Sequence, residues 1–416
     1  MSVVKPTYNP FLGRLSQGVI HLFYLLIFLL IGCVEPFEGA EFVNSFEDVL
    51  VVNATITNEN KHQEVVLTRS FQFDEDEIPN EVGAQVSVSD LSGNSYAFQE
   101  TSPGKYTSVN TFAAQLNEAY TLNITTAEGR SYTSESMSLP TTSTSIDNLY
   151  AERIINDDGV EGMSIFVDSF DPSGTSRFYR HEFVETFKII APFWSPLDAV
   201  VITEGRNTFE VRAILREQEE HVCYGEARER NVIVNSTIGL DEDRLQRFPV
   251  RFIDRNDYIL SYRYSVLVRQ YVHSTEAFSF YETLQGLAQT SGNIFSEDQP
   301  GFLQGNITSI DDPRENVAGF FDVAAVDEKR IIFSYEDFFP NEELPPYTAD
   351  CVVTAPTTTG GLGERALLNL IYDDKIRFYD FNFGTIPGGG PFLVVRRDCG
   401  DCTALGSNKI PEFWTE

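Results

Sequence analysis

The chain has 416 residues, of which 62 are acidic and 30 are basic, so its formal charge is -32 at pH 7. A surface of that sign repels phosphate backbones and anionic lipid headgroups, which excludes nucleic-acid binding and membrane binding that rest on charge alone. Hydrophobic residues make up 42% of the chain, with 33 Phe and 18 Tyr, which excludes wholesale disorder and suffices for sizeable cores in about two domains.

The first segment, residues 1–32, has the pattern of a lipoprotein signal peptide. An apolar run from Val19 to Gly32 follows a basic start and ends directly before Cys33. The run is shorter than the roughly 20 residues that cross a membrane comfortably. We expect lipidation of Cys33, with diacylglycerol on its sulfur and a further acyl chain on its amine, and several acyl chains anchor a protein durably. The alternatives are an uncleaved signal anchor, or an ordinary signal peptide with a chance cysteine.

Residues 33–48 are expected to form an acidic tether, a spacer that lets a lipid-anchored body stand off its membrane. Cleavage would remove Lys5 and Arg14 and no acid, so the loss of these two cations takes the formal charge from -32 to -34. The simplest explanation of this charge is solubility at a crowded cell surface. A specific cation site is the less favoured alternative.

Residues 49–138 predict a run of short strands with turn residues between them. The β-branched segment Leu50–Thr57 is followed by Val65–Ser70, and later alternating segments are separated by turns such as Asp90–Asn94. Such a pattern over about 100 residues is typical of an immunoglobulin-like antiparallel β-sandwich. Residues 139–145, a Pro followed by small polar residues, are the predicted linker.

Residues 146–416 are predicted to form a second mainly-β domain that carries at least one amphipathic helix. The clearest strand is Tyr258–Val272, and Asp241–Asp243 could open a short helix. A helical insertion is predicted near 274–290, where Ser274 is a good N-cap and apolar side chains recur at helical spacing. We expect this apolar stripe to face the core rather than a partner.

Four cysteines follow Cys33, namely Cys223, Cys351, Cys399 and Cys402. An even number in an exported chain indicates disulfides, and three pairings are possible. The Cys399–Cys402 spacing also occurs in redox and zinc motifs, so these uses stay open. It follows a strand-like segment instead of opening a helix, and no second such motif completes a four-thiolate zinc site.

No motif for catalysis or for a cofactor stands out, and we expect no enzymatic activity, no cofactor and no metal site. The histidines outside the signal segment have no metal-ligand spacing, so each is expected to be a surface or packing residue: His62, His181, His221 and His273. No nucleophile elbow is present, and the glycine-rich residues 360–363 and 387–391 lack the Gly-Lys-Ser/Thr of a phosphate-binding loop.

Acid clusters are frequent, and solvated loops explain them most simply. They occur at Asp74–Glu77, Asp157–Asp158, Asp241–Asp243, Asp311–Asp312 and Asp373–Asp374. A calcium site built from separate loops remains open, and so does a carboxylate pair that hydrolyses glycosides, because the separation of two carboxylates is a tertiary property.

Several segments resemble landmarks of one family. In the C-terminal half they occur in the expected order at Gly292–Phe295, Gly305–Thr308, Gly319–Ala324, Cys399–Cys402 and Pro411–Trp414. With the strand patterns of the N-terminal part, the mature chain resembles the domain-of-unknown-function 4249 family, lipoproteins of Bacteroidota. Residues 191–257 show little of this likeness.

The resemblance implies a location and a partner, and it implies no catalytic position, because the family has no established catalytic residues. Such proteins are outer-membrane lipoproteins often encoded beside TonB-dependent receptors, and Glu35, Glu38 and Glu41 look like signals for the outer face. We expect a non-enzymatic surface lipoprotein, held in the outer membrane by the lipid on Cys33, that assists a TonB-dependent receptor in nutrient uptake. The alternatives are an adhesin or structural component of an envelope assembly and, less favoured, a hydrolase with an unrecognised carboxylate pair.

Overall fold

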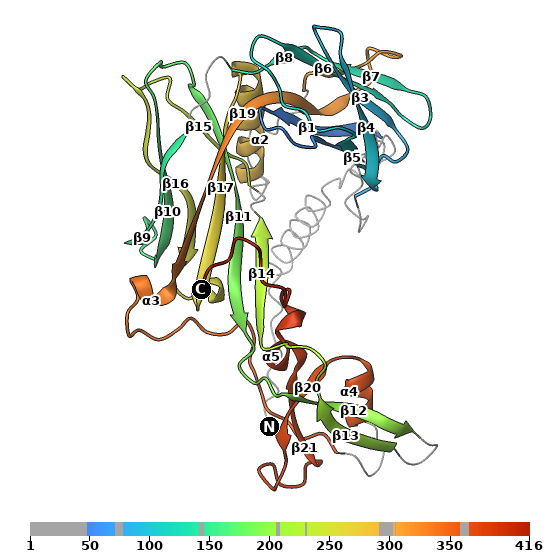
Figure 1. Ribbon diagram of the computed structural model, residues 1–416, viewed down its shortest axis with the longest axis vertical. Helices are drawn as coiled ribbons and strands as arrows, with labels where there is room; N and C mark the ends of the chain where they lie inside the picture. Colours follow the sequence, from blue (N-terminus) through green and yellow to red (C-terminus); the bar gives the residue numbers. More distant parts are fainter. Residues whose placement is uncertain are drawn as a thin grey trace, which may run out of the picture. The chain divides into compact units, whose positions relative to one another are not determined.

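The computed structural model describes residues 48–70, 78–140, 145–204, 209–228, 231–290, 303, 305–357 and 366–416. The signal-like residues 1–32 and Cys33 lie outside the described residues, and so does the tether as far as residue 47. In the described part, the fold is mainly β, as the sequence predicts (Figure 1). No helix in the described part of the chain has the length and apolar content needed to cross a membrane.

The first strands, which lie in the predicted sandwich region, are β1 (Leu50–Thr57), β2 (Glu64–Arg69), β3 (Gln85–Asp90), β4 (Ser95–Ser102), β5 (Lys105–Ser108), β6 (Ala119–Thr125), β7 (Ser131–Ser134) and β8 (Met137–Ser138). The strands that follow are β9 (Ile146–Ile155), β10 (Glu161–Asp171), β11 (Phe178–Ile190), β12 (Leu197–Glu204), β13 (Phe209–Leu215), β14 (Val222–Arg228), β15 (Ile233–Ser236), β16 (Asp243–Asp254), β17 (Arg263–Val272), β18 (Ile307–Ser309), β19 (Val317–Ser334), β20 (Ile376–Phe381) and β21 (Phe392–Arg396). The helices are α2 (Thr275–Thr290), α3 (Tyr335–Phe338), α4 (Ala366–Tyr372) and α5 (Arg397–Gly400), with 3-10 turns η2 (Tyr258–Leu260) and η4 (Cys402–Ala404).

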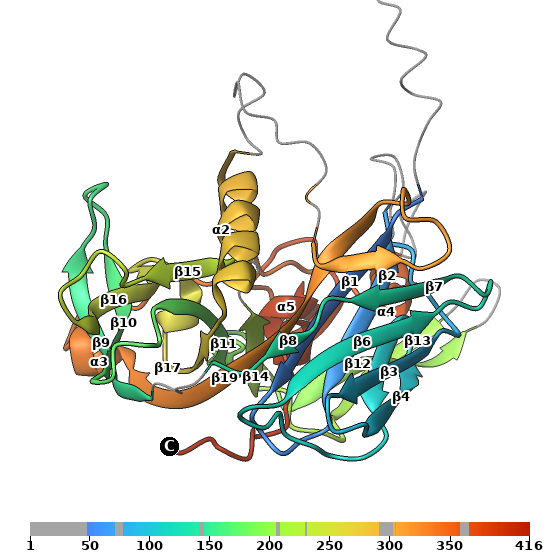
Figure 2. The ribbon, with the colours of Figure 1, turned by 90° about the horizontal axis from the view of Figure 1, so that it is seen from above.

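The sandwich-like part has a core that follows from alternating side chains. In β6, Tyr120, Leu122 and Ile124 are buried while their neighbours are partly exposed. Inward-facing residues of β1, β2, β3, β5 and β7 join the same core, which places these strands in layers around it (Figure 2). A two-residue hydrophobic period therefore sets which face of each strand is buried.

Strand β19 joins the predicted N-terminal region to the rest of the chain. Its first half pairs with β1 in parallel, from Leu50 with Val317 to Thr57 with Ala324, and its second half pairs with β17 in antiparallel fashion. Gly319 permits the close approach, because a Cβ there would lie 1.8 Å from the carbonyl oxygen of Val52. One hydrogen-bonded sheet thus runs across the predicted linker, of which residues 141–144 lie outside the described residues.

Helix α2 begins where the sequence predicts it. The hydroxyl of Ser274 accepts a hydrogen bond from the Ala277 N–H at 3.2 Å, the expected N-cap contact. The helix packs against β11, β15 and β19, with Ala277 and Tyr281 buried. Its apolar stripe therefore faces the core, as predicted.

Three local predictions were wrong. The segment Leu367–Ile371, for which the sequence predicts a strand, belongs to helix α4. The strand predicted from Tyr258 starts only at Arg263, because Asp257 accepts a hydrogen bond from the Ile259 N–H and caps the 3-10 turn η2. The short helix predicted at Asp241–Asp243 is a turn that leads into β16, and Asp243 is buried there by Tyr179 and Thr237.

The hairpins β12–β13 and β20–β21 and the helix α4 form what we call the hairpin lobe. Its core is small and consists of Ala199, Leu367, Phe378, Phe392 and Val394. With so few buried side chains, the hydrophobic contribution of the lobe is modest, and covalent and polar links gain importance.

Candidate functional site

The four cysteines form two disulfides, as the sequence predicts, and neither disulfide joins the two cysteines of the short motif to each other. Cys223 pairs with Cys402 and Cys351 pairs with Cys399, at Cα–Cα distances of 5.5 and 5.7 Å. Both lie in the usual range for a disulfide. The two cysteines of the short motif are thus linked to different segments of the chain, Cys402 to β14 and Cys399 to the irregular segment around residue 351. We call this meeting point of β14, that segment, α5 and η4 the junction.

Asp401 lies between the two cysteines of the junction and is almost fully buried. Its Oδ1 accepts a hydrogen bond from the Thr403 N–H at 2.8 Å, which caps η4, and its Oδ2 accepts from Arg377 Nε and Nη2 at 3.0 and 2.8 Å. Burial alone would raise the pKa of Asp401, but the hydrogen bonds from Thr403 and the charge of Arg377 outweigh it and hold the pKa below its usual value. The carboxylate is therefore ionised and fully engaged at neutral pH.

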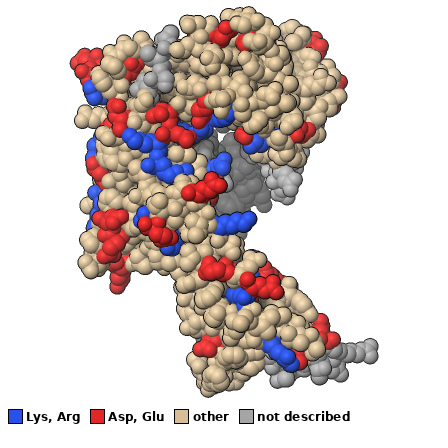
Figure 3. Space-filling view, in the orientation of Figure 1, with Lys and Arg blue, Asp and Glu red and all other residues tan. Residues whose placement is uncertain are grey.

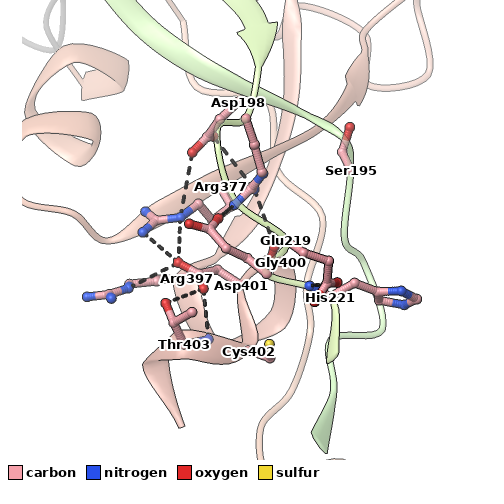
Figure 4. Close-up of polar contacts among 12 residues, drawn as sticks. Ser195, Asp198, Glu219, His221, Arg377, Arg397, Gly400, Asp401, Cys402 and Thr403 are labelled. Atoms are coloured by element: carbon pink, nitrogen blue, oxygen red, sulfur yellow. Dashed lines mark hydrogen bonds and ion pairs between the residues drawn. The ribbon is translucent and has the colours of Figure 1, made fainter. Parts of the chain in front are cut away.

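Two further carboxylates lie beside Arg377, and Figure 4 shows one of them, Asp198. Asp374 binds Arg377 at 2.6 Å, and Asp198 of β12 lies 3.6 Å away. Asp374 adopts a positive φ of 55° after α4, and the backbone bonds from Asp374 to Ile371 and from Lys375 to Leu370 complete a helix C-cap. The end of α4 therefore positions Asp374 against Arg377.

Ser195 and His221 lie near this network but form no catalytic pair. The His221 ring points away from Asp198 and Asp401, and Ser195 stands on a separate segment (Figure 4). Trp194 stacks on the His221 ring with a centroid distance of 5.1 Å, and the Ser195 hydroxyl accepts from the Leu197 N–H. A hydroxyl nucleophile needs a base within hydrogen-bond reach, and His221 is not placed to serve Ser195.

A shallow surface pocket of about 440 Å³ borders the junction. It is lined by Lys375, Arg396, Arg397, Asp398, Ala404 and Leu405. Each of its cations already has an acidic partner, at 3.0 Å for Lys375 with Asp373, 2.7 Å for Arg396 with Asp398 and 2.5 Å for Arg397 with Asp374. The pocket offers hydrogen-bond donors, but its positive charge is compensated.

A second polar cluster, which we call the Arg180 cluster, lies under α2. Arg180 Nε donates to His273 Nε2 at 3.1 Å, and His273 Nδ1 lies 2.6 Å from Asp322 Oδ2. Because a guanidinium only donates, Nε2 must be the acceptor, so the neutral ring carries its proton on Nδ1 and donates it to Asp322. The rings of Tyr271 and Tyr281 cover Arg180 at 4.4 and 4.5 Å.

Burial sets the protonation of the histidines near α2. Desolvation lowers the pKa of His273 although Asp322 opposes the shift, and it lowers the pKa of His181 to about 4 against a hydrogen bond with Gln270. Both rings are neutral at pH 7. The side chains of His273 and Asp322 have no exposed surface, and the cluster links β11, β19, α2 and the residue that follows β17.

The remaining candidates from the sequence are dispersed. His62 is exposed and His221 is half-buried, while His181 and His273 pack in the interior. Asp157–Asp158 lie in an exposed turn between β9 and β10, and Asp74–Glu77 lie outside the described residues. Among the residues that the structure describes, no group of three or more His, Cys, Asp or Glu side chains is placed to hold a metal ion. A calcium site stays untested.

Sequence signals could have indicated only part of these sites. The junction follows from the Cys399–Cys402 motif, but Arg377 and Asp198 are distant in sequence and carry no motif. The Arg180 cluster was missed because its members are single residues on separate strands.

Comparison with known proteins identifies a family. The family model described as a domain of unknown function (DUF4249) matches residues 34–330. No curated protein matches the chain. The match ends within β19, so α4, β20, β21 and three of the four disulfide cysteines, Cys351, Cys399 and Cys402, lie beyond it.

Proposed function

Because the chain belongs to the DUF4249 family, whose description names no activity, we propose that it is a non-enzymatic surface lipoprotein that assists a TonB-dependent receptor in nutrient uptake. The observation that carries the proposal is the apolar run that ends at Cys33, followed within eight residues by Glu35, Glu38 and Glu41. Lipid on Cys33 would hold the body at the outer membrane, and the acids would direct it to the outer face.

The polar clusters support a binding role over a catalytic one. The His273–Asp322 pair is sealed under α2, and Asp401 is held by Arg377 and Thr403. A catalytic acid or base must reach a substrate proton within hydrogen-bond distance. The side chains of His273, Asp322 and Asp401 instead form hydrogen bonds within the fold.

Lipidation is tested by mass spectrometry of the protein isolated from membranes. The expected product begins at Cys33 and carries three acyl chains, and a Cys33→Ser variant should appear in the soluble fraction or keep its signal segment. An unmodified thiol on a chain still in the cytosol would contradict the proposal. Protease treatment of intact cells should cleave the wild-type protein, whereas full protection would argue against surface exposure.

The partner is tested by extracting the lipidated protein in mild detergent and identifying what co-purifies. A TonB-dependent receptor recovered in stoichiometric amount supports the proposal. Recovery of the protein alone, or with other envelope proteins only, would favour the adhesin or structural alternative.

A further inference from the structure

The loop between β20 and β21, residues 382–391, presents the most exposed large hydrophobic side chain in the described part of the chain. Phe383 is 90% exposed, whereas Phe381 beside it is 38% exposed and Phe378 is buried. The Phe381 ring lies 6.0 Å from Phe383 and 5.1 Å from Phe378 between centroids. A column of aromatic rings therefore leads from the core of the hairpin lobe to the tip of this loop, which we call the Phe383 loop.

Hydrogen bonds of the Asn382 side chain and a close contact of the Gly390 backbone fix the conformation of the Phe383 loop. The Asn382 side chain donates to the carbonyl oxygens of Ile386 and Gly390 at 3.1 and 2.8 Å, and its oxygen accepts from the Ile386 N–H at 3.0 Å. Gly390 lies so close to Pro356 that a Cβ would come within 2.0 Å of its carbonyl oxygen. Phe383 is thus held outward by a braced turn, and little conformational entropy would be lost when it binds.

The charge of this region differs from that of the whole chain. Residues 381–395 contain no charged side chain, and residues 366–400 hold four acidic and four basic ones, while the chain as a whole has a net charge of -32. On the face shown in Figure 3, acidic and basic side chains lie side by side over the hairpin lobe. An uncharged loop on a surface with equal numbers of acidic and basic side chains fits an uncharged apolar pocket, and its binding needs no electrostatic attraction.

The backbone N–H groups beside Phe383 favour a protein pocket over a lipid bilayer as the binding environment of this loop. The N–H groups of Gly384, Thr385 and Gly388 donate no hydrogen bond to any residue that the structure describes. In hydrocarbon such groups are costly because nothing there can accept their hydrogen bonds, whereas carbonyl oxygens at the rim of a protein pocket can.

We propose that the Phe383 loop is a docking knob that inserts into an uncharged apolar pocket on the extracellular loops of the transporter partner, with rim carbonyls accepting from the free backbone N–H groups. Exposed aromatic anchors on rigid turns are the residues that dominate many interfaces. This inference rests on the proposed function and names the surface through which it acts.

The test compares three full-length lipidated proteins extracted under the same mild detergent. Phe383→Ser removes the knob, and Leu91→Ser is the matched control because Leu91 is 74% exposed in the turn between β3 and β4. We expect Phe383→Ser to lower the recovered transporter at least tenfold and Leu91→Ser to leave it unchanged, with equal melting curves for all three. Wild-type protein that recovers no transporter overturns the proposed function and the knob together. Equal recovery with Phe383→Ser overturns the knob alone.

A second measurement separates the protein pocket from the bilayer. The emission of a Phe383→Trp variant, corrected for the two native Trp by subtraction of the wild type, reports whether position 383 leaves water. We expect no blue shift in phosphatidylethanolamine and phosphatidylglycerol vesicles that lack the transporter, and a blue shift when it is present. A blue shift in the vesicles alone overturns the proposal in favour of lipid insertion.

Discussion

The Arg180 cluster and the junction at Asp401 both bury charged groups, but they lie in different settings. Under α2, Arg180, His273 and Asp322 are enclosed by long strands and two tyrosine rings, and no covalent link is needed. The hairpin lobe has a core of five buried residues, and the junction beside it holds Asp401 among two disulfides and several ion pairs. Where apolar burial is small, this chain therefore holds its elements together with covalent and ionic links.

The comparison is tested most severely by Asp322→Ala. This change leaves the buried His273 N–H without its acceptor and removes a negative charge near Arg180, which keeps its ion pair with Glu182. Removing a charged acceptor from a buried donor costs about 3 kcal/mol in unfolding free energy, which urea denaturation measures. Asp312→Ala, which removes a half-exposed acid paired with the exposed Arg314, should leave the curve unchanged. An unaltered midpoint for Asp322→Ala would show that the cluster does not hold the fold.

The junction is tested by the double change Cys223→Ala with Cys402→Ala. Loss of a disulfide typically costs about 2–4 kcal/mol, and we expect it to weaken the adjoining hairpin lobe, because the junction packs on β20 and β21 and the core of the lobe is small. Hydrogen exchange should show reduced protection in β20 and β21 and unchanged protection in α2. The pair Cys351→Ala with Cys399→Ala opens a shorter loop, with a sequence separation of 48 instead of 179, so its effect should be smaller. A uniform loss of protection would erase the distinction between the two regions.

Acid should weaken the two regions in different pH ranges. The pKa of His181 is about 4 in the folded protein and about 6.5 when unfolded, so the unfolded chain binds more protons between these values. Stability near α2 should therefore fall by up to about 3 kcal/mol as the pH drops from 6.5 to 4. The pKa of Asp401 is lowered, so its contribution is complete above its usual value of 3.8 and is lost only at lower pH.

Hydrogen exchange between pH 7 and pH 3 distinguishes these ranges. Protection of β11 and β17 should decline first and that of β20 and β21 later. A His181→Gln variant should flatten the first decline. Simultaneous loss in both regions would be incompatible with the assignment.

The smallest expected effect concerns Asn382→Ala, which removes the brace of the Phe383 loop. The three hydrogen bonds are partly solvent-accessible, so we expect a loss of about 1 kcal/mol in unfolding free energy, measured by thermal melting. Thr385→Ala in the same loop removes a side chain with no described hydrogen bond and is the control. If the two variants melt alike, the loop is not braced by Asn382.

Local patterns predicted the elements well where one side of a strand or helix is buried. Alternating apolar and polar residues around Tyr120 predicted β6, and apolar residues at helical spacing around Tyr281 predicted α2. Ser274 predicted the start of this helix. Hydrophobic patterns did not predict the hydrogen bond at Asp257, where a capped turn replaces the first residues of a predicted strand.

Long-range partners could not be predicted. The pairing of β1 with β19, the choice of Cys223 for Cys402, and the meeting of Arg377 with Asp198 each join residues far apart in the chain. Hydrophobic period and residue type report which face is buried and carry no information about which distant strand covers it. The glycine-rich sequence of the Phe383 loop predicts a loop but not the exposure of Phe383, because exposure of a side chain follows from the tertiary fold.

The pairing of β1 with β19 has a consequence for the order of folding. A chain emerging from its N-terminus presents β1 early, but its parallel neighbour arrives only with Val317. Until then β1 has β2 on one edge and an open row of peptide groups on the other, a template for wrong pairing. Closure of this sheet should therefore be a late and slow event, and a truncated chain that ends before Gly319 should aggregate through its first strand.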